Sequence, residues 1–396
     1  MTNATRLVGV AAAAFGLSLM GGAACAQSPV KIGFISTMSG PEGVIGRELA
    51  DGFKLAVKHA GSKFGGRPLE VIYADDQFKP DVGRQLADKM VESDKVHIVS
   101  GIIFSNILLA AVKPVLDSGA FYVSSNAAPS NIAGKQCHPR FFGVGFQNDQ
   151  NYEGMGQYLR DKGYKKVYLM APNYPAGKDM LNGVKRYYKG EVSAEVYTAM
   201  GQLDYSAEIA QIRAAKPDAV LIFYPGGMGI NFVKQYSQAG LKDQIPLFAG
   251  GGVIDQTILP AVGDAAVGLF AGALWSEFLD NAANKKFTTD FEAEYNRIPS
   301  PYAALAYDTA RLITTAGDQI GGKIEDKAAY QKALEAAKFD SVRGKLKLNT
   351  NHMAIQDYYM TRIEKDEKGR YVGALKEKIM TDLTDAYAGD CKMPAP

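Results

Sequence analysis

Residues 31–57 read KIGFISTMSGPEGVIGRELADGFKLAV, an apolar run that passes through a short loop into a stretch with helical periodicity. The run that begins this stretch, VKIGFI at 30–35, is continuously rather than alternately apolar, which is typical of a strand buried on both faces of a parallel sheet. After the loop, Leu49, Phe53 and Val57 recur at every fourth position, which predicts a helix. A buried strand followed by a helix is the repeating unit of an α/β fold.

The same unit recurs along the chain in two rounds, the second of which begins near residue 148. Further strands are predicted at 69–76, 96–101, 120–125, 166–173, 191–198 and 218–227. Helices are predicted at 47–61, 81–93, 107–119 and 205–217. Beyond residue 276 the pattern turns helical, and two final antiparallel strands are predicted at 342–353 and 356–373. The predicted fold class is α/β, with two doubly wound parallel-sheet lobes.

The overall composition is that of an ordinary globular protein. The chain has 396 residues, of which 22% are charged and 47% hydrophobic, and this length is sufficient for two or three domains. Its formal net charge is +2, so electrostatics alone favours neither a nucleic-acid partner nor an anionic membrane surface. We therefore expect no nucleic-acid partner.

The N-terminus departs from this average. Arg6 precedes the apolar run LVGVAAAAFGLSLMGGAACA, which ends in Ala24-Cys25-Ala26. A basic residue, an apolar core and an Ala-x-Ala end predict a secretory signal peptide over residues 1–26 and a periplasmic location for the mature chain. Four glycines in the run argue against a membrane anchor. A lipoprotein attached at Cys25 is the other alternative, although Gly22 stands where a large aliphatic residue would be expected.

Removal of the signal peptide leaves two cysteines, Cys137 and Cys391. Two cysteines in an exported chain predict one disulfide, because the compartment is oxidising. This disulfide would close a very long loop and hold the C-terminal tail. The alternative is a pair of free, buried thiols.

The ligand site of a parallel α/β sheet lies at the carboxyl ends of its strands, where loops lead into helix N-termini. Nearly all of the loops predicted at these ends are small, polar and uncharged; they lie at 37–43, 101–106, 124–131, 171–178, 224–229 and 249–255. This composition suits the binding of a small molecule better than catalysis.

Catalytic signatures are missing from the sequence. It contains no GxSxG elbow, no GxxxxGK[ST] phosphate loop and no HExxH motif, and its four histidines are scattered. Tyr174 with Lys178 is the nearest pair of a nucleophile and a base, and we expect Lys178 to be a solvated helix residue. We predict no enzyme activity, no metal and no cofactor.

Several stretches, in this order, resemble one known family: residues 31–57 as quoted, VIYADDQ (71–77), GAFYVSSNAAPS (119–130) and LDYSAEIAQIRAAKPDAVLIFYPGGMG (203–229). The chain resembles the type I periplasmic solute-binding proteins of ABC importers, in the leucine/isoleucine/valine-binding branch. The resemblance implies two lobes, joined by three crossover segments, that close on a ligand without catalysis. Lobe 1 would comprise 29–147 and 276–354, and lobe 2 would comprise 148–275 and 355–396. It also implies a monomer that delivers its ligand to an ABC permease of the inner membrane.

The resemblance also implies which residues line the cleft. These are Met38, Ser39, Ser105, Asn106, Asn126, Ala127, Ala128, Tyr174, Tyr224, Pro225, Gly226, Gly227, Met228, Gly250 and Gly251. In the amino-acid binders of this family, serine hydroxyl and backbone N–H groups hold the ligand carboxylate, while a threonine and a glutamate hold its ammonium group. Here Ala128 stands at the threonine's position and Gly251 at the glutamate's, so both positions depart from the family pattern.

These departures predict a ligand without an ammonium group, because a buried ammonium without an acceptor or countercharge costs several kcal/mol. Nearby aromatic side chains would suit a flat ring: Phe104, Phe142, Tyr174, Tyr205 and Tyr224. The predicted ligand is a small carboxylate, namely an aromatic acid of the hydroxybenzoate or hydroxycinnamate type. Some relatives in the same branch bind such acids.

Two alternatives stay open. In the first, the ligand is a branched-chain or other amino acid, or an amide. In the second, the chain is a ligand-sensing receptor of the same fold. Glu42 and Glu277 bear on the first of these, because either carboxylate would weaken the argument against an ammonium group if it reached the cleft.

Overall fold

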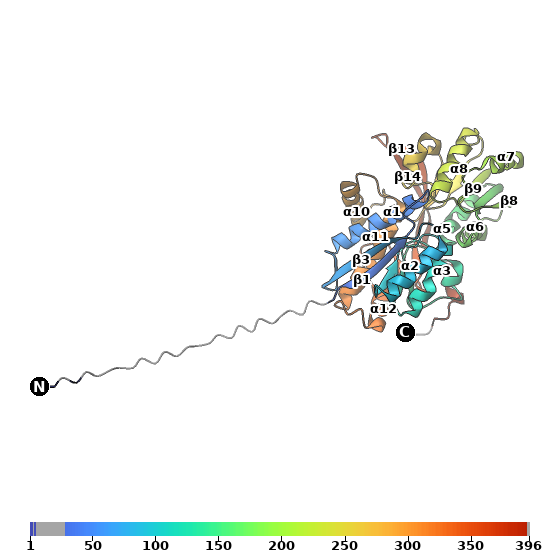
Figure 1. Ribbon diagram of the computed structural model, residues 1–396. Coiled ribbons are helices and arrows are strands. Elements are labelled where there is room, and N and C mark those ends of the chain that lie inside the picture. The colour runs from blue at the N-terminus through green and yellow to red at the C-terminus, as the bar shows by residue number, and fades with distance from the viewer. Residues whose placement is uncertain (3, 5–27, 394–396) are drawn as a thin grey trace.

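The computed structural model describes residues 1–2, 4 and 28–393. These residues form two α/β lobes, each built on a sheet with helices packed against its faces (Figure 1). The α/β class and the two parallel-sheet lobes are therefore confirmed. Apart from residues 1, 2 and 4, the predicted signal peptide, including Cys25, lies outside the described residues.

The sheet of lobe 1 has the strand order β2-β3-β1-β4-β5-β6, and its pairs are parallel except for β2 with β3. Its strands are β1 (Val30–Ser36), β2 (Lys63–Phe64), β3 (Arg67–Asp75), β4 (Ile98–Ser100), β5 (Phe121–Ser124) and β6 (Phe141–Gly143). Ile32 and Phe34 in β1 are fully buried, as expected for a central strand that helices cover on both sides.

The helices of lobe 1 come from two separate parts of the chain. They are α1 (Gly43–His59), α2 (Pro80–Glu92), α3 (Ser105–Asp117), α4 (Ser130–Ala133), α10 (Ala282–Tyr295), α11 (Pro301–Gln319) and α12 (Lys327–Ala336). The N-terminus of α11 is well defined, because the Ser300 side chain accepts the N–H of Ala303 and Pro301 occupies the first helical position. It packs along α1, and this contact holds the segment from α10 to α12, residues 282–336, against lobe 1 (Figure 1).

The sheet of lobe 2 has the order β12-β13-β11-β10-β9-β7-β8, with β14 paired to β13. Its strands are β7 (Lys166–Pro172), β8 (Glu191–Thr198), β9 (Ala219–Ile222), β10 (Leu247–Ala249), β11 (Phe270–Ala273), β12 (Lys347–Leu348), β13 (Ala354–Lys365) and β14 (Tyr371–Leu383). The pairs from β8 to β11 are parallel, and those that involve β13 are antiparallel.

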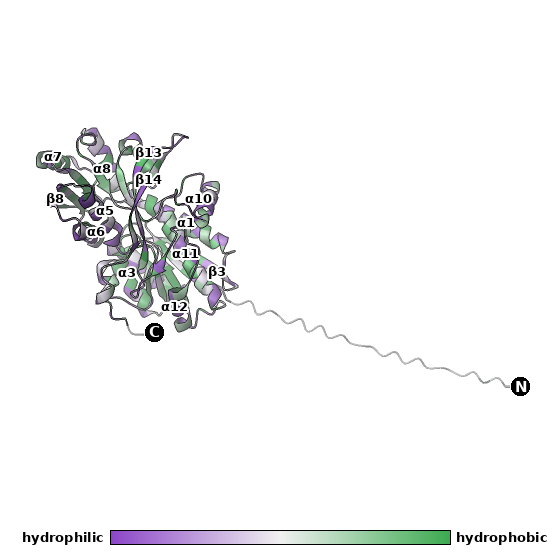
Figure 2. Cartoon of the chain, turned by 180° about the vertical axis from the view of Figure 1, so that it is seen from behind, coloured by the Kyte–Doolittle hydropathy of each residue, from purple (hydrophilic) through white to green (hydrophobic). Residues whose placement is uncertain are grey.

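The helices of lobe 2 are α5 (Gln150–Asp161), α6 (Pro175–Tyr187), α7 (Ser206–Ala215), α8 (Gly227–Gln238), α9 (Leu259–Val262) and the 3₁₀ turn η1 (Gly263–Ala266). A second 3₁₀ turn, η2 (Ala388–Asp390), lies in the C-terminal tail. Figure 2, which views the molecule from behind, shows helices that carry both hydrophobic and hydrophilic residues, as expected when one face of a helix packs on a sheet. In the described part of the chain, no helix is long and apolar enough to span a membrane.

The chain passes between the lobes at three places, which are residues 144–149, 274–281 and the segment 337–353 between α12 and β13, which contains the short strand β12. One prediction in this region is wrong. Instead of a continuous strand over 342–353, this segment forms the short strand β12 and isolated bridges at Gly344 and Met353, and the two long antiparallel strands are β13 and β14. The loop before β12 carries Arg343, which is fully buried and forms an ion pair with Asp308 of α11.

Cys137 and Cys391 form a disulfide, with their Cα atoms 5.6 Å apart. The predicted pairing is confirmed. Cys137 follows α4 in lobe 1, whereas Cys391 ends a tail that leaves β14 in lobe 2. The bridge therefore connects the two lobes close to the crossing segments.

Candidate functional site

The loops at the carboxyl ends of the parallel strands face each other across the boundary between the lobes. On the lobe 1 side, Ser105 and Asn106 begin α3. Ser105 is fully buried, and its Oγ accepts a hydrogen bond from Asn148 Nδ2 at 3.1 Å. The buried Asn106 Oδ1 finds no hydrogen-bond partner in the described structure. Because the first N–H groups of a helix lack intrahelical acceptors, this helix end can bind a polar group.

The VSSNAAPSN loop after β5 lies beside this helix end. Asn126 Nδ2 donates to the carbonyl of Ile103 at 3.0 Å, which ties the two loops together. Asn126 Oδ1 and Ser125 Oγ are buried, and no residue of the described chain bonds to either. The predicted site residues Ala127 and Ala128 are buried, and their carbonyls accept bonds from Ser124 Oγ and the Asn148 N–H. The side-chain atoms that this loop leaves without a partner are Ser125 Oγ and Asn126 Oδ1.

Three buried polar atoms without a protein partner thus lie on two neighbouring loops, namely Asn106 Oδ1, Ser125 Oγ and Asn126 Oδ1. Such atoms are rare in folded proteins, because a buried polar group without a hydrogen bond costs about 1–3 kcal/mol. Their concentration at the strand ends of a parallel sheet marks a place where a ligand can supply the missing bonds.

Aromatic rings close this place from both lobes. Tyr174 precedes the first residue of α6, and its ring lies 6.3 Å from that of Phe104 of lobe 1. It also stacks on Phe223 of lobe 2 at 6.2 Å. Phe223 was not predicted as a site residue; its neighbour Tyr224 was. Strand alternation explains the difference, because successive side chains of a strand point to opposite faces.

Two of the predicted aromatic residues lie in the core of lobe 2 instead. Tyr224 is fully buried, with its ring 4.9 Å from Tyr205 and 5.4 Å from Phe232. A third, Phe142 of lobe 1, stacks on His352 at 4.1 Å. These three rings stabilise the lobes rather than line the boundary between them.

The glycines after β10 pack against α5 and against Tyr302 of α11. A Cβ on Gly250 would lie 2.1 Å from the ring of Tyr152. The carbonyl of Gly251 accepts a bond from Asn151 Nδ2 at 3.0 Å, and that of Gly252 accepts one from the Tyr302 hydroxyl at 2.8 Å. These glycines allow α5 and Tyr302 to approach the sheet closely.

The loop after β1 holds Met38 and Ser39. The Met38 N–H donates to Asp75 Oδ1 at 2.9 Å, and Arg47 donates to the Met38 carbonyl at 2.7 Å. Met38 is half-buried and Ser39 is exposed. In this loop it is Glu42 that reaches the opposite lobe.

Glu42 is 3% exposed, and its Oε2 accepts the N–H of Gly227 at 3.0 Å. Burial raises its pKa from the usual 4.5 to about 7, although hydrogen bonds from the Gly227 and Met228 N–H groups act in the other direction. A carboxylate is therefore present at the boundary. The departures at Ala128 and Gly251 therefore do not by themselves exclude a ligand with an ammonium group, because Glu42 supplies an acid at the boundary.

Glu277 borders a small cavity of about 20 Å³ beside β11, together with Asp255 and the predicted site residue Gly251. Burial raises the pKa of Glu277 to about 7 and that of Asp255 to about 6. Among the described residues, no group of three or more histidine, cysteine, aspartate or glutamate side chains could hold a metal ion.

A second contact between the lobes was not predicted. Asp179 of α6 accepts the N–H and the Oγ of Ser130 at 3.0 and 2.8 Å, and Nδ2 of Asn148 at 2.9 Å. Burial raises its pKa. A possible signal was the polar run NDQNYE at 148–153, which is buried throughout.

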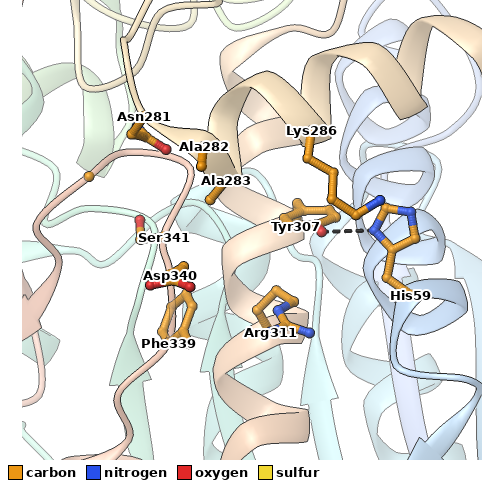
Figure 3. Close-up of a pocket in the computed structure, with 11 residues that line it drawn as sticks. His59, Asn281, Ala282, Ala283, Lys286, Tyr307, Arg311, Phe339, Asp340 and Ser341 are labelled. Carbon is orange, nitrogen blue, oxygen red and sulfur yellow. Dashed lines mark hydrogen bonds between the residues drawn. The ribbon is translucent and has the colours of Figure 1, made fainter.

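A larger cavity of about 590 Å³ lies in lobe 1, away from this boundary (Figure 3). It is lined by the ends of α1 and α10, by α11 and by the loop near residue 340, and His59 bonds there to the Tyr307 hydroxyl at 2.8 Å. Lys286 and Arg311 also line it. None of the predicted site residues does.

Comparison with known proteins gives consistent results. A family model described as "Periplasmic binding protein" matches residues 29–369. Leu/Ile/Val-binding protein homolog 6 of Brucella melitensis biotype 1 is 29% identical over 352 residues, which is 86% of this chain and 89% of that protein.

Solved structures of similar proteins extend this comparison. An ABC-transporter solute-binding protein from R. palustris in complex with benzoate has a TM-score of 0.87 and 28% identity, covering 92% of this chain and 100% of that one. Another from Rhodopseudomonas palustris BisB5, in complex with 3,4-dihydroxybenzoic acid, has a TM-score of 0.85 and 28% identity, covering 90% and 99%. A leucine-binding protein LivK from Thermotoga maritima shares the fold, with a TM-score of 0.77 and 19% identity over 88% of this chain and 98% of its own.

Proposed function

Because this chain belongs to the periplasmic binding protein family, whose members bind solutes, we propose that it captures a small aromatic carboxylate and delivers it to an ABC importer. The proposed ligand is of the hydroxybenzoate or hydroxycinnamate type. The observation that carries the proposal is the cluster of unpartnered polar atoms at Asn106, Ser125 and Asn126, next to the rings of Phe104 and Tyr174. Two similar proteins of known structure hold benzoate and 3,4-dihydroxybenzoic acid.

Capture requires only that the lobes bind and position the ligand, without a chemical step. The ligand carboxylate docks on lobe 1, at Ser105, Asn106 and the Asn126–Ala128 backbone. Lobe 2 then closes over the ring, bringing Tyr174 and the turn at 224–228 against it. Water is excluded as the lobes meet, and the closed surface is what the permease recognises. We propose no covalent step, no cofactor and no catalysis.

The remaining parts of the proposal concern the chain as a whole. Residues 1–26 act as a cleavable signal peptide, so that the mature protein works in the periplasm as a monomer beside an inner-membrane ABC permease. Lobe 1 comprises 29–147 and 276–354, and lobe 2 comprises 148–275 and 355–396.

A branched-chain amino acid is the second candidate ligand. Glu42 favours it, since a buried carboxylate at the lobe boundary could pair with an ammonium group. The name of the Brucella relative points the same way.

A thermal-shift screen of the mature protein distinguishes these ligands. One panel contains benzoate, hydroxybenzoates and cinnamates, and the other contains leucine, isoleucine, valine and further α-amino acids. We expect a shift of several degrees from at least one hydroxylated aromatic acid, because a ligand at a thousandfold excess over its Kd stabilises the fold by about 4 kcal/mol. A response to amino acids alone would replace the aromatic ligand by the second candidate.

Replacing Asn106 tests the location of the site. The described chain provides no partner for Asn106 Oδ1, so Asn106→Ala should leave the melting temperature of the ligand-free protein unchanged or raise it. Affinity for the aromatic acid should fall by about tenfold, as expected for the loss of one buried hydrogen bond. Asn182→Ala, at an exposed position of α6, serves as the control. Equal affinities of the two variants, measured by calorimetry, would move the site away from α3.

A further inference from the structure

We infer that Glu42 is a positioning residue for ligand capture: it reaches from lobe 1 to cap helix α8 of lobe 2, and this contact makes closure of the lobes dependent on pH. The inference rests on the proposed function for its biological role, and on the contact between the lobes for its physics. Glu42 itself need not touch the ligand, whereas its partner Gly227 belongs to the turn at 224–228 that is part of the proposed site.

The contact joins an acid to a helix end. Glu42 lies directly before α1, and its Oε2 accepts the N–H of Gly227, the first residue of α8, at 3.0 Å. The N–H of Met228 donates to the same carboxylate. The first N–H groups of a helix have no intrahelical acceptor, and the partial positive charge of the N-terminus favours a carboxylate there. Because α8 belongs to lobe 2, this cap can form only when the lobes meet.

Two glycines make room for the approaching loop. Gly226 has φ of +62°, and a Cβ there would lie 2.1 Å from Glu42 Oε2. Gly227 has no such backbone requirement, yet its Cβ would lie 2.7 Å from Cβ of Pro41. Gly227 therefore lacks a side chain because of a residue in the other lobe rather than because of its own helix.

Closure moves the Glu42 carboxylate from water into a largely apolar boundary. The titratable groups whose charge interacts with that of Glu42 are the phenols of Tyr174, of Tyr302 at the start of α11, and of Tyr205 in the core of lobe 2. Burial raises the pKa of all three phenols above 10, so they stay neutral at physiological pH. Among the described residues, no lysine, arginine or histidine contributes to the shift of the Glu42 pKa.

The sign of the pH effect follows from this environment. The pKa of Glu42 is about 7 in the closed structure, and an exposed glutamate in open lobes should keep its usual value near 4.5. Closure therefore favours the protonated acid. Its contribution is complete below pH 4.5 and is lost as the pH rises through 7. By linkage, the closed state should be about 30-fold more favoured at pH 5.5 than at pH 8.

Two variants separate the charge from the contact. Glu42→Gln keeps an oxygen acceptor for the helix N–H groups but cannot ionise. Calorimetric titration with 4-hydroxybenzoate should show about 30-fold weaker binding by the wild type at pH 8 than at pH 5.5, and a change under about fivefold for Glu42→Gln. The remainder would come from Asp179, whose pKa burial also raises. The control Glu70→Gln removes an exposed charge of lobe 1 and should keep the wild-type pH dependence.

Gly227→Ala tests the contact itself. Alanine is the better helix former, so lobe 2 should not be weakened and the melting temperature of the ligand-free protein should stay the same or rise. The added methyl group collides with Pro41 only when the lobes close. We expect at least tenfold weaker binding of 4-hydroxybenzoate. Wild-type affinity in this variant, or an unchanged pH dependence in Glu42→Gln, would overturn the inference.

Failure of the proposed ligand class can be told apart from failure of the closing contact. If no aromatic acid binds any variant, small-angle X-ray scattering of the ligand-free proteins provides the readout. The wild type should then be more compact at pH 5.5 than at pH 8, whereas Gly227→Ala should have the same radius of gyration at both. Equal compactness of the wild type at the two pH values would refute the closing contact, even if the ligand were identified later.

Discussion

Replacing Arg343 by methionine should lower the free energy of unfolding by about 3–5 kcal/mol, the usual cost of removing one partner from a buried ion pair. The side chains of Arg343 and Asp308 are both 0% exposed, and Nε of the arginine lies 2.8 Å from Oδ2 of the aspartate. Without the guanidinium, the buried Asp308 carboxyl group would lose its countercharge and its bond from Nε. Only Ser341 Oγ and the Val342 N–H would then remain to bond it.

The loss should affect more than one pair, because Arg343 also holds the first crossing segment. Its guanidinium donates to the carbonyls of Gly145 and Val144 at 2.9 and 3.0 Å, and to Gln356 Oε1 at 2.7 Å. All of these groups are buried, so the Val144 carbonyl and Gln356 Oε1 would lose this donor, whereas the Gly145 carbonyl would keep its bond from Gln356 Nε2 at 3.0 Å. We therefore expect ligand affinity to fall together with stability, since 144–149 sets the relative position of the lobes.

Urea unfolding followed by circular dichroism measures the effect. Arg84→Ala is the matched control, because Arg84 and Asp88 form an Arg–Asp pair of similar length, 3.0 Å, whose side chains are 53% and 35% exposed. That variant should lose less than about 0.5 kcal/mol. Asp308→Leu combined with Arg343→Met should recover part of the loss, since no buried charge is then left unpaired. A loss below about 1 kcal/mol for Arg343→Met would contradict the argument.

The fold could be predicted from local patterns because its central strands are buried on both faces. VKIGFI and AVLI read as apolar runs, and these became β1 and β9. The C-terminal hairpin was misplaced because its turn chemistry was overlooked. Asp366 accepts the N–H groups of Lys368 and Arg370, and Gly369 adopts φ of +75°, so the chain reverses within EKDEKGRY. The predicted strand at 356–373 therefore divides into the end of β13 and the start of β14.

In the site, too, the positions of loops could be predicted from the sequence, whereas contacts between the lobes could not. Topology alone places Ser105 and Asn126 at the carboxyl ends of β4 and β5, and these loops carry the unpartnered polar atoms. The partners of Glu42 and Asp179 depend on how the lobes face each other, which no local pattern encodes. Spacing also could not decide that Phe223 rather than Tyr224 faces Tyr174, since a shift of one residue reverses the faces of a strand.

Removal of the Cys137–Cys391 disulfide is the second large effect that we expect, with a loss of about 2–5 kcal/mol from the free energy of unfolding. The bridge spans 254 residues of sequence. For a loop of that length, the chain-entropy model assigns about 5 kcal/mol to the constraint on the unfolded chain. The value is an upper bound because unfolded chains retain some compactness.

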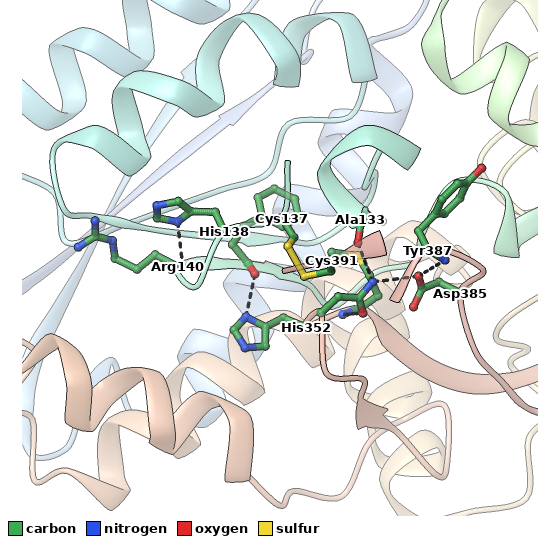
Figure 4. Close-up of a disulfide and its surroundings, with 11 residues drawn as sticks. Ala133, Cys137, His138, Arg140, His352, Asp385, Tyr387 and Cys391 are labelled. Atoms are coloured by element: carbon green, nitrogen blue, oxygen red, sulfur yellow. Dashed lines mark hydrogen bonds between the residues drawn. A yellow bond between two sulfur atoms is a disulfide. The ribbon is translucent and has the colours of Figure 1, made fainter. Parts of the chain in front are cut away.

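The folded state should change little, because other contacts hold the tail in place (Figure 4). Asp385 accepts Nδ2 of Asn351 at 2.9 Å, and the Tyr387 N–H donates to Asp385 at 2.9 Å. The Tyr387 hydroxyl lies 2.7 Å from Asp149 Oδ2. The effect of the disulfide should therefore arise in the unfolded chain, and ligand affinity should change by less than about threefold.

The double variant Cys137→Ser with Cys391→Ser, made in the mature chain, separates these contributions. Its midpoint of urea unfolding should lie well below that of the oxidised wild type. Dithiothreitol should bring the wild type to the same midpoint and leave the double variant unaffected. If the variant instead lost ligand affinity in proportion to stability, the bridge would be acting on the orientation of the lobes, since Cys137 belongs to lobe 1 and the tail of Cys391 leaves lobe 2. An unchanged midpoint would mean that the tail contacts alone account for the order of the C-terminus.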